Sequence, residues 1–364
     1  MVSHGVTKNV NLPILNNVLI RIIDKTVRFT TTNLEIAVTA TLRGKVDDEG
    51  EFTVPSKLFS DYVSLLSNDR VDVELINDSI AIESLATKTK IKGIPASEFP
   101  LIPKLDSTIA YRLPVADFRR ALGRVIFAVS TNESRPELSG VLMKFEPTGP
   151  SGSLLLAATD SYRLSEARVP LHEGSGSSER SVIVPVRTMA EIARILGAFK
   201  ESGENRQTLE IVVADNQILF LYDSIELISR TIDGKYPDYR AIIPESAKTT
   251  ITVSRDELQK GVKASALFTR SGINDVQLIV DSALSKLTLR SSDSQTGENE
   301  SVLLGEIAGI DNAVTLNFRY LLDGINAIDG DRVSLKLVDG AVPCLLEPAN
   351  ELKNYLYIVM PIRQ

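Results

Sequence analysis

The side chains that most often perform catalysis are few in this sequence and poorly placed for it. The two histidines are His4, near the start of the chain, and His172, in a loop rich in Gly and Ser. The one cysteine, Cys344, lies in the apolar run Val-Pro-Cys-Leu-Leu, which predicts a buried structural thiol rather than a nucleophile. These residues give no positive sign of an enzyme.

Phosphate-binding and metal-binding motifs are also missing from the sequence. The Gly-Lys pairs at 44–45 and 234–235 lack the upstream glycine that a phosphate loop needs. Acidic residues are plentiful, so an active site made only of carboxylates stays open as an alternative. Asp160 and Asp293 fall in turns between strands, where local hydrogen bonds account for them. We expect no enzyme, no metal and no cofactor.

Lysine and arginine offer a different chemistry, the binding of phosphate groups. The formal net charge of the 364 residues is −7, which taken alone argues against a nucleic-acid partner. Yet in the predicted helix 114–130, Phe118 and Leu122 lie on one apolar stripe while Arg120 and Arg124 lie on the opposite side. Helices predicted at 186–196 and 255–266, and a last helix that follows Asn317, repeat this arrangement.

On any one helix, such bases would be ordinary solvated side chains. Nearby acids such as Asp61, Glu191 and Asp323 also dilute the pattern. Repeated over four helices, it indicates one cationic surface suited to a phosphate backbone, without reading of base sequence. The residues expected to face nucleic acid are Arg119, Arg120, Arg124, Arg135, Arg187, Arg194, Lys260, Lys263 and Arg319.

The elements that would position these side chains recur three times along the chain. A strand that runs into a helix at or beside a proline occurs at 51–59 and 181–189, with a degraded copy at 313–321, where Asn317 can cap the helix. Strands with alternating apolar residues, each leading to a polar turn, begin at 18, 140 and 276. The repeats predict three α+β domains, 1–103, 104–240 and 241–364. The Pro-rich stretches 95–103 and 236–244 are predicted linkers.

The compartment can also be predicted from composition. A single cysteine excludes an internal disulfide and fits a reducing environment. No apolar run approaches the roughly 18 residues that span a bilayer. Residues 1–11 have no apolar segment of the kind found in a secretory signal. We expect a cytoplasmic protein without a membrane partner.

Five segments, in order along the chain, resemble the beta subunit of bacterial DNA polymerase III, the sliding clamp. They are Leu-Pro-Ile-Leu-Asn-Asn-Val-Leu-Ile (12–20), Arg-Pro-Glu-Leu-Ser-Gly-Val-Leu (135–142), Ala-Thr-Asp-Ser-Tyr-Arg-Leu (158–164), Asp-Gly-Lys-Tyr-Pro-Asp-Tyr-Arg (233–240) and Tyr-Ile-Val-Met-Pro-Ile-Arg (357–363). The resemblance implies three tandem clamp domains with sheets outside and helices lining a central pore. It implies a ring, formed by a head-to-tail homodimer, that encircles double-stranded DNA as a processivity factor.

The resemblance also implies a groove between the second and third domains that binds short linear motifs of the replicative DNA polymerase, the clamp loader and repair proteins. Ser161 stands where many members of the family have glycine, and Ala341 shortens one wall. The implied wall comprises Leu138, Thr159, Ser161, Tyr162, Arg163, Leu164, Pro237, Ile273, Asn317, Tyr320, Ala341, Pro343, Val359, Met360, Pro361, Ile362 and Arg363.

The start of the sequence departs from the family pattern. Members usually begin with a strand and a full helix before the Leu-Pro-Ile-Leu segment, whereas here residues 1–11 precede it. We therefore expect the first domain to lack part of its fold and one pore helix. This departure motivates an alternative function, that of a peptide-binding scaffold of the same fold that does not encircle DNA.

Overall fold

The computed structural model describes residues 12–67, 70–85, 87–103, 105, 109–132, 134–147, 152–173, 175–199, 208–270, 272–349 and 354–363. The chain forms two compact units, each built on a nine-stranded sheet. The first unit contains residues 1–115, 172–177 and 187–231, and the second contains the remainder. The middle predicted domain, 104–240, contributes to both units. The expectation for residues 1–11 falls outside the described residues.

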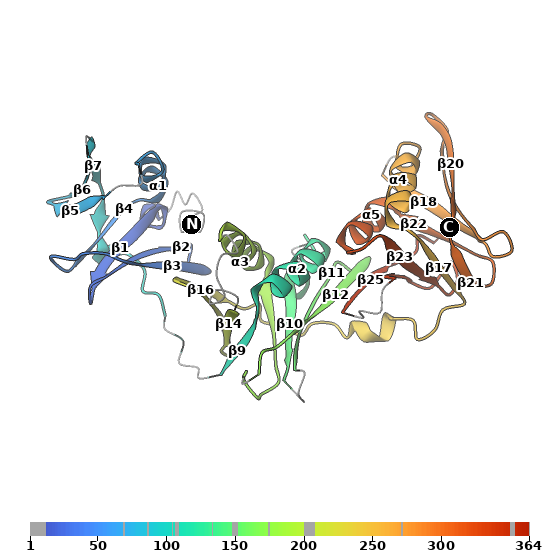
Figure 1. Ribbon diagram of the computed structural model, residues 1–364, viewed down its shortest axis with the longest axis horizontal. Coiled ribbons are helices and arrows are strands. Elements are labelled where there is room, and N and C mark those ends of the chain that lie inside the picture. The colour runs from blue at the N-terminus through green and yellow to red at the C-terminus, as the bar shows by residue number, and fades with distance from the viewer. Residues whose placement is uncertain are drawn as a thin grey trace. The chain divides into compact units, whose positions relative to one another are not determined.

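The sheet of the first unit is antiparallel and combines two parts of the chain (Figure 1). Its strands, in spatial order, are β8 (Ile94–Pro95), β4 (Gly50–Pro55), β1 (Asn17–Ile23), β2 (Thr26–Thr32), β3 (Ile36–Arg43), β16 (Ile225–Arg230), β15 (Gln217–Tyr222), β14 (Thr208–Val213) and β9 (Ala110–Pro114). The unit also contains helices α1 (Ser56–Ser64) and α3 (Val186–Ala198) and a small sheet of β5 (Asp72–Ile76), β6 (Ser79–Ser84) and β7 (Thr87–Lys92). Pairing of β3 with β16 joins the first predicted domain to part of the second.

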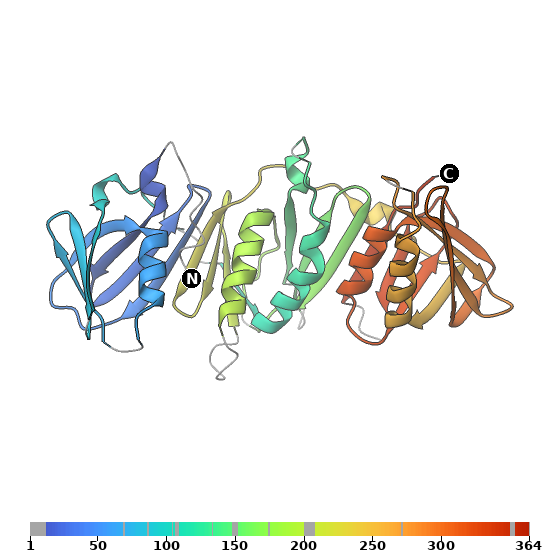
Figure 2. The same cartoon turned by 90° about the horizontal axis from the view of Figure 1, so that it is seen from above.

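The second unit repeats this construction with a later part of the chain. Its large sheet has the order β13 (Arg180–Pro185), β10 (Gly140–Glu146), β11 (Ser153–Thr159), β12 (Arg163–Pro170), β25 (Tyr355–Val359), β24 (Cys344–Pro348), β23 (Arg332–Leu337), β17 (Thr249–Ser254) and β21 (Glu306–Gly309). A second sheet contains β20 (Gly297–Leu304), β19 (Lys286–Asp293), β18 (Asp275–Asp281) and β22 (Asn312–Asn317). Helices α2 (Val115–Val125), α4 (Arg255–Ala266) and α5 (Phe318–Ala327) complete it, and α4 lies beside α5 (Figure 2).

The apolar stripes predicted on the helices are the faces that the helices bury. Phe118 and Leu122 on α2, Leu258 on α4 and Leu321 on α5 have no solvent exposure. An amphipathic helix buries its apolar stripe because each square ångström of apolar surface removed from water contributes about 25 cal/mol. The helices predicted at 186–196 and 255–266 are confirmed, whereas the one predicted at 114–130 ends at Val125 and is followed by a 3₁₀ turn, Ile126–Ala128.

The strand-to-helix repeat is confirmed, with one correction to the place of its prolines. Pro55 and Pro185 are the last residues of β4 and β13, and each helix begins at the next residue. Asn317 caps α5 as predicted, because its side chain accepts a hydrogen bond of 2.9 Å from the Arg319 N–H.

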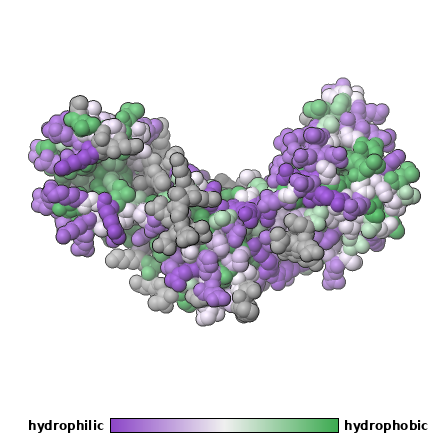
Figure 3. Space-filling model, viewed as in Figure 1, coloured by the Kyte–Doolittle hydropathy of each residue, from purple (hydrophilic) through white to green (hydrophobic). Residues whose placement is uncertain are grey.

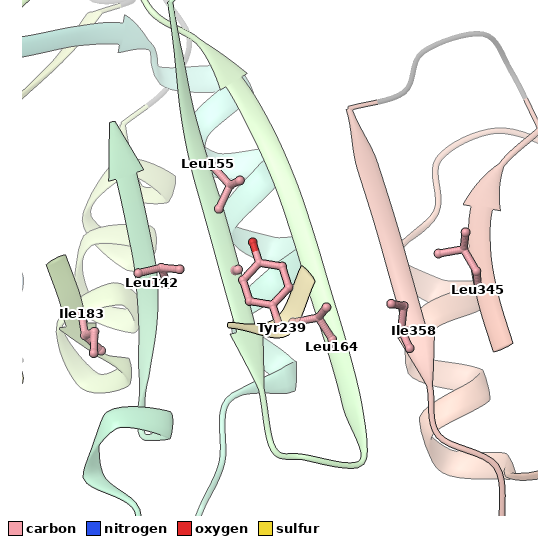
Figure 4. Packing of buried hydrophobic residues seen from close by; sticks show 8 residues of the cluster. Leu142, Leu155, Leu164, Ile183, Tyr239, Leu345 and Ile358 are labelled. Atoms are coloured by element: carbon pink, nitrogen blue, oxygen red, sulfur yellow. The ribbon is translucent and has the colours of Figure 1, made fainter. Parts of the chain in front are cut away.

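The stretch predicted as the second linker, 236–244, is ordered and packs on the large sheet of the second unit. It contains a 3₁₀ turn, Tyr239–Ile242. The ring of Tyr239 lies among Leu155 and Leu164, close to the strands that carry Ile358 and Leu345 (Figure 4). Its hydroxyl donates a 2.5 Å hydrogen bond to the buried Glu166, and burial raises the pKa of Tyr239 far above its ordinary value. The segment therefore covers the place where β12 meets β25.

Gly324 provides a test of how closely α5 approaches the sheet. A Cβ added there would lie closer to the buried Tyr357 ring than van der Waals contact allows. We expect Gly324→Ala to lower the free energy of unfolding by about 1–3 kcal/mol, the usual cost of overpacking. Thermal unfolding followed by circular dichroism measures it.

Gly123→Ala is the matched control, since it is also a helical glycine but has open space around the added carbon. It should stabilise the protein by about 0.5–1 kcal/mol through helix propensity alone. A Gly324→Ala protein as stable as the Gly123→Ala protein would contradict the close approach.

Candidate functional site

The bases predicted to face nucleic acid lie in two settings in the structure. Arg187 on α3, Lys260 and Lys263 on α4 and Arg319 on α5 are exposed. In the space-filling view, hydrophilic residues gather over α4 and α5 (Figure 3). α4 and α5 are neighbours in one unit, so their three bases lie on adjacent helices, where α4 also carries the exposed acids Asp256 and Glu257.

The remaining bases have carboxylate partners or are less exposed. Arg120 is exposed but lies 3.4 Å from Asp117 and 3.7 Å from Asp329. Arg194 is half-buried and pairs with Glu191 at 2.5 Å, and Arg119 is also half-buried. These acids reduce the positive charge that their helices present, and Asp256 and Glu257 do the same on α4.

Arg124 does not project from α2, and its prediction as an outward-facing base is wrong. Its residue exposure is only 8%. The guanidinium forms an ion pair with Asp329 and lies 5.2 Å from the centre of the Tyr355 ring. The helical wheel places it away from Phe118, but Tyr355 on β25 covers that side as well. A residue that the wheel assigns to solvent therefore fixes α2 against the third predicted domain.

The turn between β11 and β12 gathers several residues of the implied groove. The Asp160 carboxylate accepts hydrogen bonds from the N–H groups of Tyr162 and Arg163, at 2.9 and 3.0 Å. Ser161 adopts φ +79°, in the left-handed region where glycine is favoured, in line with the glycine expected at this position. The exposed Arg135 donates to Ser161 Oγ at 3.2 Å and so lies beside the same turn. The turn presents Tyr162 to solvent with 64% exposure.

The C-terminal segment is fixed beside this turn by main-chain hydrogen bonds. The Met360 N–H donates to the Tyr162 carbonyl at 2.9 Å, and the Ile362 N–H donates to the Thr315 carbonyl at 2.8 Å. Pro361 lies between these two bonds and is half-buried. The structure thus brings the 159–164 turn together with residues 359–362.

The other implied wall residues differ in exposure. Tyr320 stacks on Tyr162 with ring centres 6.5 Å apart. Ile273 is exposed, while Pro237, Asn317 and Pro343 are half-buried. Buried residues, which can support a wall but offer little surface to a ligand, are Leu138, Thr159, Leu164 and Val359. Ala341 and Arg363 are exposed.

Sequence reasoning missed the role of Asp323. Its spacing from Arg319 suggested a pair along one helix turn, but the structure pairs it with Arg163 from β12. Phe127 and Tyr357 were missed as well, since both lie against Arg163 or its neighbours. Nothing in the local pattern could have found these partners, because the residues are far apart in the chain.

Cys344 and Asp293 have structural surroundings, and the exposed His172 ring lies 3.4 Å from the Thr208 hydroxyl. Cys344 is fully buried, and burial raises the pKa of its thiol to about 12. Hydrogen bonds from the N–H groups of Gln295 and Thr296 lower the pKa of Asp293, so its carboxylate is occupied by its own turn. Within the described ranges no cluster of His, Cys, Asp and Glu could hold a metal ion, and no helix is long and apolar enough to cross a membrane. His4 lies outside the described residues.

Comparisons with known proteins agree along the whole chain. Models of the N-terminal, central and C-terminal domains of the DNA polymerase III beta subunit match residues 1–103, 112–238 and 240–363. The beta sliding clamp of Synechococcus elongatus is 30% identical over 367 residues, and that of Synechocystis sp. is 29% identical over 382 residues. In both cases the match covers 100% of this chain and 95% of the relative.

Solved structures show the same fold. The Thermotoga maritima DNA polymerase III beta subunit is 27% identical with a TM-score of 0.88, and the Bacillus subtilis sliding clamp is 25% identical with a TM-score of 0.90. Each match covers 100% of this chain and 95% of the other. The resemblance drawn from five sequence segments is thereby confirmed, and the chain belongs to the DNA polymerase III beta subunit family, the beta sliding clamps.

Proposed function

We propose that two copies of this sliding clamp pair head to tail into a ring that encircles duplex DNA in the cytoplasm. The ring tethers the replicative polymerase and performs no catalysis of its own. Its modules are the three domains 1–103, 104–240 and 241–364. The observation that carries ring closure is a pair of oppositely charged strands that end their sheets in the described part of the chain, one in the first domain and one in the third.

The first free edge is β7, the last strand of the small sheet β5-β6-β7. Lys88, Lys90 and Lys92 are all exposed on it. Lys88 pairs with Glu83 on β6, and Lys92 pairs with Asp78 in the turn before β6, but such exposed pairs contribute little stability and can exchange partners. The strand presents a row of main-chain groups that can pair with another strand.

The second free edge is β20, the first strand of the sheet β20-β19-β18-β22. Glu298 and Glu300 are exposed on it, followed by Val302 with 53% exposure and Leu304 with 69%. Carboxylates opposite the lysines of β7, with apolar side chains beside them, suit strand addition between two copies. Because the two edges differ, the contact is heterologous, and a rotation that closes gives a ring.

DNA inside such a ring is held by topology rather than by affinity. The exposed bases of α3, α4 and α5 supply weak contacts to phosphates that do not depend on base sequence. Weak contacts suit sliding, because each can break without release of the ring. The non-encircling scaffold is not favoured, since the named relatives are sliding clamps matched over the whole chain.

The groove formed by the 159–164 turn, residues 359–363 and α5 is the proposed site for short motifs of the polymerase, the clamp loader and repair proteins. Met360 and Pro361 are half-buried apolar residues, the Met360 N–H donates to the Tyr162 carbonyl, and the Tyr162 side chain is exposed. This combination of apolar wall and polar main chain suits a Leu or Phe anchor of a peptide.

If the ring closes around DNA, the protein should stay bound to circular DNA but not to linear DNA. After loading by its clamp loader onto nicked circular duplex, the protein should co-elute with the DNA in gel filtration. It should be lost when a restriction enzyme linearises the circle, because the ring slides off the ends. Equal retention on circular and linear DNA would support the non-encircling scaffold instead.

Substitution of the exposed lysines of α4 and substitution of the buried Arg124 should have different effects. Lys260→Met with Lys263→Met should make the dependence of DNA affinity on log salt shallower by about 2, since each lost phosphate contact removes about 0.9. Arg124→Met should leave that slope unchanged and lower the free energy of unfolding by about 1–3 kcal/mol, because its buried bonds are structural. If the Arg124→Met protein had normal stability and a shallower dependence of DNA affinity on log salt, Arg124 would face DNA as the sequence predicted.

If peptides bind in the proposed groove, shortening the apolar side chains of its wall should lower the affinity for them. Met360→Ala with Pro361→Ala should weaken a fluorescent synthetic hexapeptide containing Leu-Phe by about tenfold or more, as expected for lost burial of apolar side chains. Fluorescence anisotropy measures the dissociation constant. Leu284→Ala, an exposed apolar residue away from the groove, is the control. Unchanged affinity in the double variant would remove the groove assignment.

A further inference from the structure

The second and third domains meet where β12 pairs with β25, and we call this place the joint. Five side chains form a continuous stack across the joint, and we refer to them as the column. The column comprises Tyr162, Tyr320, Arg163, Phe127 and Tyr357. The Tyr162 and Tyr320 rings stack at 6.5 Å, and the Arg163 guanidinium lies 4.6 Å from the Tyr320 ring and 5.4 Å from the Phe127 ring. Phe127 then meets Tyr357 at 5.6 Å. The column runs from the exposed mouth of the groove to the buried core.

The members of the column come from both sides of the joint. Phe127, Tyr162 and Arg163 precede residue 240, whereas Tyr320 lies on α5 and Tyr357 on β25. Tyr357 also donates a 2.9 Å hydrogen bond to the Tyr320 carbonyl. The column therefore links the turn of one groove wall to the helix that carries the other.

Arg163, at the centre of the column, donates hydrogen bonds through each of its three nitrogens to protein groups. Its Nε donates to Asp160 at 3.0 Å, one terminal nitrogen pairs with Asp323, and the other donates to the Phe127 carbonyl at 2.8 Å. Rings cover its faces, and its side chain is only 12% exposed. A guanidinium is planar with donors around its rim, so lysine could not satisfy the same set.

The charge of Arg163 is stabilised in place. Burial by itself lowers the pKa of the guanidinium, but Tyr357, Asp323 and Asp160 outweigh burial and raise it. The ion pair with Asp323 is thus a fixed charged link between β12 and α5. Such bonds between planar groups fix direction as well as distance.

We propose that Arg163 is a positioning residue of the peptide groove, which sets the separation of its two walls through the column and Asp323. This inference rests on the proposed groove. The ligand meets Tyr162 and Tyr320, while Arg163 acts through them. Main-chain pairing of β12 with β25 does not depend on Arg163, so its loss should disturb the groove more than the fold.

The absence of tryptophan from the sequence allows a local reporter. In a Tyr162→Trp protein the new indole stacks on Tyr320 and is the only source of tryptophan emission. Into this background we would introduce Arg163→Lys, Arg163→Met and Asp323→Asn. Arg332→Met is the control, since Arg332 is an exposed arginine of the same unit that pairs with Glu306 at 2.8 Å.

The first measurement is made without ligand. Arg163→Lys, Arg163→Met and Asp323→Asn should each shift the indole emission to the red and increase its quenching by acrylamide, because the stack on Tyr320 loosens. Arg332→Met should leave both unchanged. Unchanged emission and quenching in all three variants would overturn the proposal.

The second measurement is the affinity for the Leu-Phe hexapeptide. Asp323→Asn and Arg163→Met should each weaken this affinity by about tenfold. The variant that carries both substitutions should bind no more weakly than either single variant, because both substitutions break the same ion pair between Arg163 and Asp323. A direct contact between Arg163 and the peptide predicts instead that Asp323→Asn binds at least as well as the parent. That result would also overturn the proposal.

The experiment also distinguishes a failure of the Tyr162→Trp reporter from a failure of the proposed groove. If the parent Tyr162→Trp protein fails to bind the hexapeptide although the unmodified protein binds it, Tyr162→Phe replaces it in the affinity arm. If the unmodified protein does not bind either, the proposed groove fails, and the emission arm still decides whether Arg163 holds the column. Asp323→Asn conserves shape at a partly exposed position, so it tests the link even if Arg163→Met does not fold.

Discussion

Main-chain pairing between β12 and β25 is the interaction on which the rest of the second unit depends. Residues Arg163 to Ala167 pair with Val359 to Tyr355, so strands separated by most of the third domain become neighbours in one sheet. Leu164 and Ile358 then pack under Tyr239, and Ser165 donates to the Arg124 carbonyl on the other face. The two domains are therefore joined by a strand ladder that is covered on both sides, and a flexible tether would not hold them in this way. The first unit uses the same device where β3 pairs with β16.

This joint divides the arginines into two groups with different chemistry. Arg124 and Arg163 lie against the joint, where each ion-pairs with one carboxylate of the third domain and stacks on an aromatic ring. Arg319 and the lysines of α4 remain exposed on the helices. Buried guanidinium groups give direction and register, whereas exposed bases remain solvated. The net charge of −7 does not reveal this division, because it averages both groups with the acidic remainder.

Local patterns in the sequence predicted the features that depend on neighbouring residues. The stripe of Phe118 and Leu122, the cap at Asn317 and the self-bonded turn at Asp160 each follow from periodicity or turn chemistry within a few residues. The burial of Arg124, the pairing of Asp323 with Arg163 and the order of the segment at Tyr239 could not be predicted in this way. Each depends on a partner more than 70 residues distant that only the folded sheet brings close. Family resemblance supplied the groove residues, but it could not say which of them face a ligand and which support the wall.

Native-state hydrogen exchange of the β12 and β25 amides tests most directly whether the second and third domains form one body. If the joint opens only with the whole unit, amides of Ser165 to Ala167 and Leu356 to Ile358 should exchange with the same opening free energy as those of the flanking β11 and β24. Exchange at the joint that is orders of magnitude faster, while β11 and β24 stay protected, would contradict it. The domains would then separate along β12 and β25, and neither the groove nor the column would have a fixed geometry.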